Sequence, residues 1–312
     1  MGIISIVGLT KSYRSGFWGK RKRALEGLNL EVEKGETFGY LGPNGAGKTT
    51  TLKILLGLIQ PDSGHATILD QSISTIKVRS RIGFLPEQPY FYDYLTGREL
   101  LEFYGHFFGL SRLQRMRRIA DLLEMVSLTG AENLALRKYS KGMLQRIGIA
   151  QALINDPDII FLDEPLSGLD PIGRKEVKDI VHTLKKEGKT IFFCSHILPD
   201  VEMICDRIGI LDKGRLIAVG SLDDLLHVEA KGIDIEFTGV SGQGLVNIRR
   251  AAKKSLEQNH RVQVTLDGDD RVMDVIRMID ESGGRVLSVI PHRMSLEEIF
   301  VNKLDLRREK FQ

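Results

Sequence analysis

The sequence predicts an α/β fold with a smaller α+β region after it. Short apolar runs alternate with longer helical patterns along most of the chain. The runs are apolar on both faces, as expected of buried parallel strands. The pattern changes after about residue 228, and the length of 312 residues allows about two domains at roughly 150 residues each.

The main region carries the stronger periodic signal. Its predicted strands are residues 37–41, 82–85, 159–162, 190–194 and 208–211. Its predicted helices are residues 50–58, 97–108, 113–126, 143–154 and 171–187. Because residues 89–155 are almost entirely helical in pattern, we expect a helical subdomain inserted between two core strands.

The last part of the chain predicts a small accessory domain. Strand-like residues 232–238, 260–266 and 285–291 alternate with helical residues 245–258, 270–282 and 295–304. We therefore place a first domain at residues 1–228 and an α+β accessory domain at residues 229–312.

Composition excludes several classes of protein. The 44 basic and 41 acidic residues give a net charge of +3, too balanced for a nucleic-acid-binding surface. Two cysteines cannot form a disulfide framework in a chain of this length. No apolar stretch approaches the ~20 residues of a membrane span, and the N-terminus lacks a signal-peptide pattern. We expect a soluble protein that reaches a membrane only through a partner.

A glycine-rich loop follows the strand at residues 37–41 and opens the next helix. Its residues are Gly42, Pro43, Asn44, Gly45, Ala46, Gly47, Lys48 and Thr49, followed by Thr50, and they match the phosphate-binding pattern G-x-x-x-x-G-K-[ST]. Glycines let successive N–H groups turn inward around phosphate oxygens, and the helix N-terminus adds a positive dipole. Lys48 is predicted to contact the β- and γ-phosphates, and the Thr49 hydroxyl to ligate Mg²⁺.

Polar side chains follow three other predicted strands. The strand at 159–162 ends in Asp163 and Glu164, and ligands gather at the carboxyl ends of parallel strands. Asp163 is predicted to face Mg²⁺, and Glu164 to orient or deprotonate the attacking water. His196 is placed to bond the γ-phosphate, and Gln88 to reach the metal or the water.

These elements, in this order, resemble the nucleotide-binding subunit of an ABC transporter. Residues 139–145, Tyr-Ser-Lys-Gly-Met-Leu-Gln, are similar to the family signature Leu-Ser-Gly-Gly-Gln but depart from it at Tyr139, Lys141 and Met143. The resemblance implies that Ser140 and Gly142 contact the γ-phosphate of ATP. It also implies a P-loop NTPase core with an antiparallel β subdomain, and ATP and Mg²⁺ as ligands.

Further segments match the same family over about residues 3–226. Residues 167–170 resemble the D-loop, which places Asp170 at the dimer interface; residues 195–196 resemble the switch-histidine segment and residues 86–88 the Q-loop. Tyr13 stands where the family stacks an aromatic ring on adenine. Trp18, in the longer segment between Arg14 and Arg23, is the alternative for that role.

The resemblance also implies partners. Two copies of this chain, or one copy and a homologous chain, are expected to sandwich ATP head to tail. Separate membrane permease subunits would hold the pair at the cytoplasmic face of the membrane. The ending Ser295–Phe300 resembles that of exporter ATPases of the daunorubicin-resistance type.

Other functions remain as alternatives. An importer ATPase could also carry a small α+β regulatory domain. A soluble ABC protein of the ribosome usually has two cassettes in one chain, and a DNA-repair ATPase would show a long coiled coil between Lys48 and Asp163, which is absent from the sequence. A non-catalytic regulator is disfavoured because Lys48, Asp163, Glu164 and His196 are all present.

The segment Pro89–Tyr94 is predicted to dock the permease. It holds four aromatic residues directly after Gln88, and exposed aromatic clusters are favoured at interfaces. The alternative is that these rings pack into the core of the helical subdomain.

Overall fold

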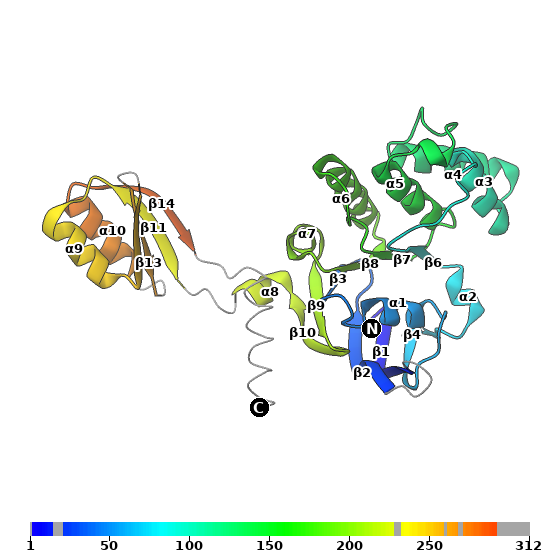
Figure 1. Ribbon diagram of the computed structural model, residues 1–312, viewed down its shortest axis with the longest axis horizontal. Coiled ribbons are helices and arrows are strands. Elements are labelled where there is room, and N and C mark those ends of the chain that lie inside the picture. The colour runs from blue at the N-terminus through cyan, green and yellow to red at the C-terminus, as the bar shows by residue number, and fades with distance from the viewer. Residues whose placement is uncertain (1, 15–20, 228–231, 259–260, 268–270, 292–312) are drawn as a thin grey trace. The chain divides into compact units, whose positions relative to one another are not determined.

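The computed structural model describes residues 2–14, 21–227, 232–258, 261–267 and 271–291. The chain divides into two compact units, one that ends at Leu222 and one that begins at Asp223 (Figure 1). The first unit has two sheets, the second has one, and each unit has its own hydrophobic core. Trp18, the helix predicted at residues 295–304 and the Ser295–Phe300 ending lie outside the described residues.

The first unit is built on a six-stranded sheet in the order β10-β9-β3-β8-β7-β6. The strands are β3 (Thr37–Leu41), β6 (Ile82–Leu85), β7 (Ile159–Asp163), β8 (Thr190–Ser195), β9 (Arg207–Asp212) and β10 (Arg215–Ser221). All neighbours pair in parallel except β9 and β10. Every residue of β3, β7 and β8 is buried, which explains the continuous apolar runs in the sequence.

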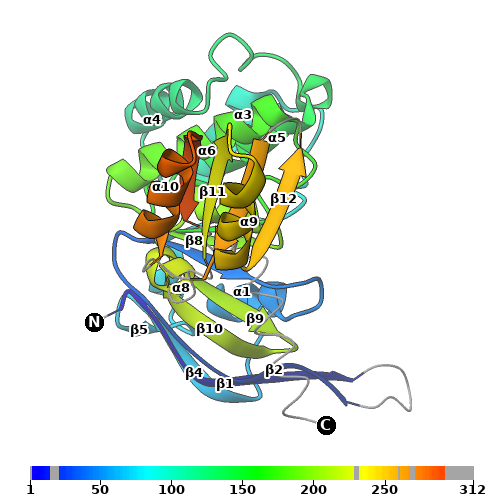
Figure 2. The same cartoon turned by 90° about the vertical axis from the view of Figure 1, so that its left-hand side faces the viewer.

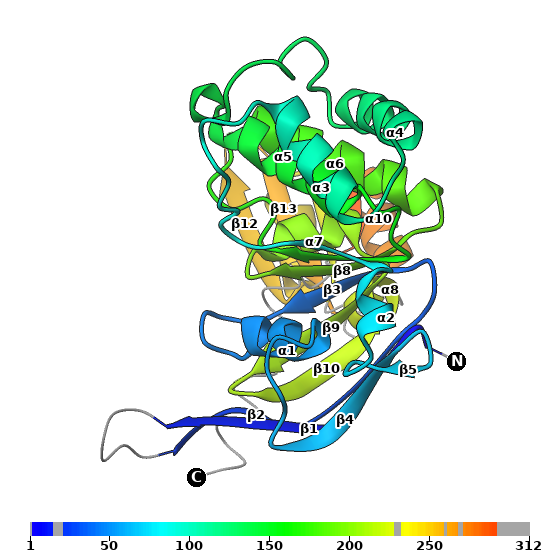
Figure 3. The same cartoon turned by 90° about the vertical axis from the view of Figure 1, so that its right-hand side faces the viewer.

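A second, antiparallel sheet has the order β2-β1-β4-β5. Its strands are β1 (Ile4–Arg14), β2 (Arg21–Val32), β4 (Ser63–Ile68) and β5 (Gln71–Ser72). Helix α1 (Lys48–Leu55) packs between this sheet and the parallel one, and all three contribute to one apolar core (Figure 3). The predicted α/β fold with an antiparallel β subdomain is therefore confirmed.

The remaining helices of this unit include those of the insertion between β6 and β7. They are α2 (Ile76–Arg79), α3 (Gly97–Phe107), α4 (Arg112–Met125), the 3₁₀ turn η1 (Leu136–Lys138), α5 (Lys141–Ala152), α6 (Pro171–Lys186) and α7 (Leu198–Ile204). Within the insertion, α3, α4 and α5 contact one another. Between β6 and β7 every regular element is helical, as the sequence predicts for the inserted subdomain. In the part of the chain that is described, no helix has both the length and the apolar character of a membrane span.

The second unit has a β-α-β-β-α-β order typical of the split βαβ motif. After α8 (Leu222–His227) come β11 (Ile233–Thr238), α9 (Gly242–Ala251), β12 (Lys254–Gln258), β13 (Arg261–Leu266), α10 (Val272–Glu281) and β14 (Arg285–Pro291). The antiparallel sheet has the order β12-β13-β11-β14, and Figure 2 shows α9 and α10 on one of its faces.

One predicted element of the second unit is wrong. The helix expected over residues 245–258 ends at Ala251, and residues 254–258 form β12. All five residues of β12 are exposed, so the strand has no alternation of buried and exposed residues. The strand forms because its backbone pairs with β13. Backbone pairing by itself leaves no periodic pattern of apolar residues, so the sequence pattern could not predict it.

Candidate functional site

The loop between β3 and α1 wraps tightly against neighbouring backbone. Gly47 has a φ of 118°, and a Cβ there would lie 2.6 Å from the carbonyl oxygen of Ala24. A Cβ at Gly42 would lie 2.4 Å from the carbonyl oxygen of Leu211. The loop therefore requires glycine at both positions. Helix α1 starts at Lys48 with no side-chain cap and no acidic residue in its first turn, which leaves its positive end available for an anion.

Lys48 is held inside this loop. Its side chain is 7% exposed, and Nζ donates a hydrogen bond to the carbonyl oxygen of Gly42 at 2.6 Å. The same Nζ lies 3.4 Å from Oε1 of Glu164. The ammonium group therefore joins the glycine-rich loop to the acidic end of β7.

Glu164 directly follows β7 with a left-handed backbone, φ 50°, which is uncommon for a residue other than glycine. Its N–H still donates to the carbonyl oxygen of Cys194 on β8 at 3.0 Å. The side chain is 7% exposed, and Oε2 accepts a hydrogen bond from His196 Nδ1 at 2.8 Å. Residues with strained backbone cluster at active sites, and Glu164 lies where loop, strand end and histidine meet.

Asp163, the last residue of β7, is buried close to other acids. Burial raises its pKa to about 6, and the charges of Glu164 and Glu87 add to the effect, while Lys48 and Lys53 oppose it. A divalent cation close to this carboxyl group would stabilise its ionised form. Mg²⁺ prefers oxygen ligands and usually takes one or two from the protein and others from phosphates and water. The Asp163 carboxylate and the Thr49 hydroxyl fit that donor set.

One cavity, of about 240 Å³, collects most of the predicted ligand-binding residues. Its lining includes Tyr13, Pro43, Asn44, Gly45, Gly47, Lys48, Thr49, Thr50, Asp163 and Glu164. Of the other predicted residues, Gly42, Ala46, Gln88, His196, Ser140, Gly142 and Asp170 do not line it. His196 still belongs to the site because it bonds Glu164.

Three further residues line the same cavity without having been predicted: Lys22, Ala24 and Glu87. Lys22 lies opposite Tyr13 in the β1–β2 pairing, so a hairpin assignment in the sequence would have found it. Glu87 occupies the place in the lining that we expected of its neighbour Gln88, which is exposed.

The signature-like residues form a separate cluster at the N-termini of α5 and α6. Ser140 caps α5 by accepting a hydrogen bond from the N–H of Met143 at 3.2 Å. Asp170 caps α6 by accepting from the N–H of Gly173 at 2.8 Å. A Cβ added at Gly142 would come within 3.9 Å of the Cα of Gly173, so the two helix starts lie side by side.

Tyr139, one of the departures from the signature, has a structural explanation. Its side chain is buried, and its hydroxyl donates to the carbonyl oxygen of Ala131 at 2.9 Å. Gly97 leaves room for the ring, since a Cβ there would lie 2.4 Å from the Tyr139 hydroxyl oxygen. Burial raises the pKa of Tyr139. The tyrosine is therefore a packing residue of the helical subdomain.

Comparison with known proteins agrees with this geometry. Residues 25–167 match the family model of the ABC transporter. An uncharacterized ABC transporter ATP-binding protein of Nostoc sp. is 46% identical over 97% of this chain and 90% of its own length. A linearmycin resistance ATP-binding protein of Bacillus subtilis is 34% identical over 90% of this chain and 94% of its own. A daunorubicin resistance ATP-binding protein of Streptomyces coeruleorubidus is 34% identical over 96% and 95%.

A solved structure shows the same architecture. It is an ATP-binding cassette in a dimeric, post-hydrolysis state bound to ADP and Pi, with 28% identity and a TM-score of 0.64. The similarity covers 70% of this chain and 98% of the solved one.

Proposed function

This chain belongs to the ATP-binding subunits of ABC transporters, and we propose that it powers an exporter through a separate membrane permease. ATP hydrolysis is its activity. The outward direction is supported by relatives named for resistance to linearmycin and to daunorubicin, since a transporter that confers resistance to a toxic compound removes it from the cell.

The roles proposed within the site rest on the contacts of Glu164 with Lys48 and His196. Lys48 binds the β- and γ-phosphates, and Glu164 is the general base that takes a proton from the attacking water. His196 holds the Glu164 carboxylate in place and bonds the γ-phosphate. Tyr13 stacks on the adenine at the mouth of the same cavity.

Asp163 and Thr49 would hold Mg²⁺ from the protein side when it binds with ATP. Gln88 does not line the cavity in this structure, and we keep it as a proposed further oxygen donor near the water. Bound at this place, Mg²⁺ would supply positive charge to the β- and γ-phosphate oxygens.

Ser140, Gly142 and Asp170 serve the ATP of a second cassette, either another copy of this chain or a homologue. Their separation from the Lys48 cavity within one chain supports this arrangement. The solved relative in its dimeric state bound to ADP and Pi supports it as well. The γ-phosphate then bonds both chains, so hydrolysis removes the contact that closes the pair.

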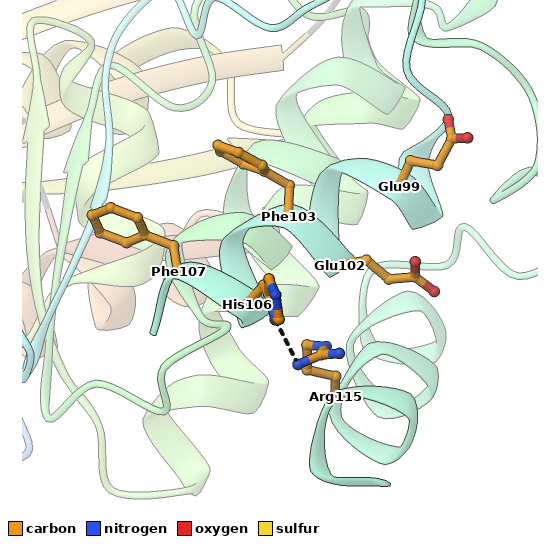
Figure 4. Close-up of a pocket in the computed structure, with 6 residues that line it drawn as sticks. All are labelled: Glu99, Glu102, Phe103, His106, Phe107 and Arg115. Atoms are coloured by element: carbon orange, nitrogen blue, oxygen red, sulfur yellow. Dashed lines mark hydrogen bonds between the residues drawn. The ribbon is translucent and has the colours of Figure 1, made fainter. Parts of the chain in front are cut away.

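The permease docks on the helical subdomain. Tyr90, Tyr92 and Tyr94 are 92%, 58% and 63% exposed, which does not fit the alternative of core packing for these three rings. Phe91 is only partly exposed and lies against α5, where a Cβ added at Gly148 would come within 3.4 Å of its ring. A groove in the same subdomain is lined by side chains of α3 and by Arg115 of α4 (Figure 4). Phe103 and Phe107 are both exposed along it. Aromatic rings with polar groups beside them are typical of protein interfaces.

The docking proposal is tested with the paired change Tyr90→Ala and Tyr92→Ala. We expect co-purification with the permease to fail while basal ATPase and melting temperature of the isolated subunit stay near those of the original protein. Ile76→Ala, another exposed apolar residue of this unit, is the matched control and should leave co-purification intact. A large fall in melting temperature of the tyrosine variant would instead assign the rings to the core.

The direction of transport is tested in membrane vesicles that carry this chain and its permease. With daunorubicin as a fluorescent probe, ATP should drive accumulation in inverted vesicles. ATP-driven uptake by right-side-out vesicles would indicate an importer.

A further inference from the structure

Asp200 is a buried carboxylate close to the proposed site, outside the cavity that holds the loop and the acids. It lies in the first turn of α7, four residues after His196, and only 3% of its side chain is exposed. A buried charge of this kind is costly unless it is paired. Its partners therefore indicate what it does.

Two cations from α6 hold Asp200. Lys178 Nζ lies 2.9 Å from Oδ1, and Arg174 Nη1 lies 3.3 Å from Oδ2. Lys178 also reaches the sulfur of Met203 on α7 at 3.4 Å. We call Asp200, Arg174 and Lys178 the α6–α7 clasp. Each oxygen of the carboxylate thus has its own cation.

The other end of the clasp is attached to the segment that resembles the D-loop. The N–H of Arg174 donates to the carbonyl oxygen of Asp170 at 2.9 Å, so Arg174 belongs to the first turn that Asp170 caps. Helix α6 also contacts α5, where Arg146 Nε lies 3.4 Å from Glu176 Oε2. Helix α6 therefore contacts both the signature helix α5 and, through the clasp, α7.

On the histidine side the connection is equally short. The N–H of Ile197 donates to Oγ of Ser195 at 3.0 Å, which fixes the turn that contains His196. Helix α7 begins at the next residue, Leu198, and Asp200 lies within its first turn. A shift of α7 relative to α6 would therefore move His196 relative to Glu164.

We propose that the α6–α7 clasp is a positioning device that makes His196 and the segment ending at Asp170 move as one body. Asp200, Arg174 and Lys178 are positioning residues; they do not touch the ATP themselves. Arrival of a second cassette at Ser140, Gly142 and Asp170 is thereby transmitted to the His196–Glu164 contact. This inference rests on the proposed roles of His196 and Glu164.

The first test is Asp200→Asn, which keeps the shape of the side chain and removes its charge. We expect kcat for ATP hydrolysis to fall by about 10-fold, because a misplacement of a catalytic group by about an ångström can cost up to about 100-fold and the contact between the two helices is only weakened. The KM for ATP and the affinity for a fluorescent ATP analogue should not change, since the cavity around Lys48 is intact.

Asp156→Asn is the matched control. Asp156 also binds two cations, with Lys189 Nζ at 2.7 Å and Arg118 Nη2 at 3.3 Å, but it lies before β7, and neither of these partners is a proposed site residue. It should leave kcat unchanged.

The second test separates positioning from stability. Asp200→Asn removes the negative charge that pairs with Lys178, so the melting temperature should fall. Adding Lys178→Met removes that unpaired charge, and the melting temperature should recover in part. If the clasp positions His196, kcat stays low in the double variant, because the ion pair that holds α7 to α6 is still missing.

Two outcomes would overturn the proposal. One is normal kcat in Asp200→Asn while His196→Ala has lost hydrolysis. The other is a recovery of kcat that follows the melting temperature in the double variant, which would make the clasp purely structural. Normal hydrolysis by His196→Ala would instead reject the role assigned to the histidine, and with it the basis of this inference.

Discussion

The two halves of the proposed ATP site differ in how complete they are within one chain. Around the phosphate loop, Lys48 and His196 each contact a carboxylate oxygen of Glu164, in or beside one cavity. Around the signature, Ser140 and Asp170 each bond the end of their own helix and do not line that cavity. The first half fits our proposal that it binds and cleaves a phosphate, and the second fits our proposal that its helix N-termini face the ATP of another chain.

Glu164→Gln should break the first half most severely. The amide keeps the hydrogen-bonding shape of the carboxylate but cannot accept the proton from water. We expect kcat to fall by at least about 100-fold while ATP still binds. Gel filtration with ATP should show a trapped dimer. Near-normal hydrolysis would remove Glu164 from the role of base.

Lys48→Ala should affect the same half through binding. It removes the ammonium contact to the β- and γ-phosphates, a charge-assisted interaction, so the affinity for nucleotide should fall by about 10-fold or more. Titration with a fluorescent ATP analogue measures this. Unchanged affinity would contradict the assignment of the loop as the phosphate site.

Gly142→Ala should affect only the second half. The nearest atoms to the added Cβ lie at 3.9 Å, so the single chain should fold and bind ATP normally. The methyl group would occupy the surface offered to the other chain's ATP. We expect hydrolysis to fall by about 10-fold, and the dimer trapped by Glu164→Gln to be lost when the two changes are combined. A dimer that persists would argue against a shared site.

The smallest effect concerns Asp163 and pH. Its pKa of about 6 in the folded chain is above the ordinary value, so the folded state holds this proton more tightly than the unfolded state does. Without Mg²⁺ and nucleotide, stability from this group is present at low pH and is lost as pH rises through about 6. Asp163→Asn should therefore melt a few degrees higher than the original protein at pH 8, and the difference should shrink at pH 5. An equal difference at both pH values would contradict the shifted pKa.

Local features of the chain were predictable from the sequence. The residues of the phosphate loop are contiguous, and glycines and a lysine at this spacing indicate phosphate binding. The buried strands are uninterrupted apolar runs because both faces of the sheet are covered. The helical insertion was predictable as well, because apolar residues recur at helical spacing within α3 and within α4.

Contacts between distant residues were decided only by the tertiary structure. The sequence predicted Glu164 and His196 as separate candidates, and the parallel pairing of β7 with β8 brings them to a hydrogen bond. The same applies to Lys22 and Glu87 in the cavity, to the polar edge strand β12, and to the partners of Asp200. A motif or a periodic pattern depends only on residues that are close in the sequence. Backbone pairing between strands and ion pairs between helices depend on how the whole chain folds.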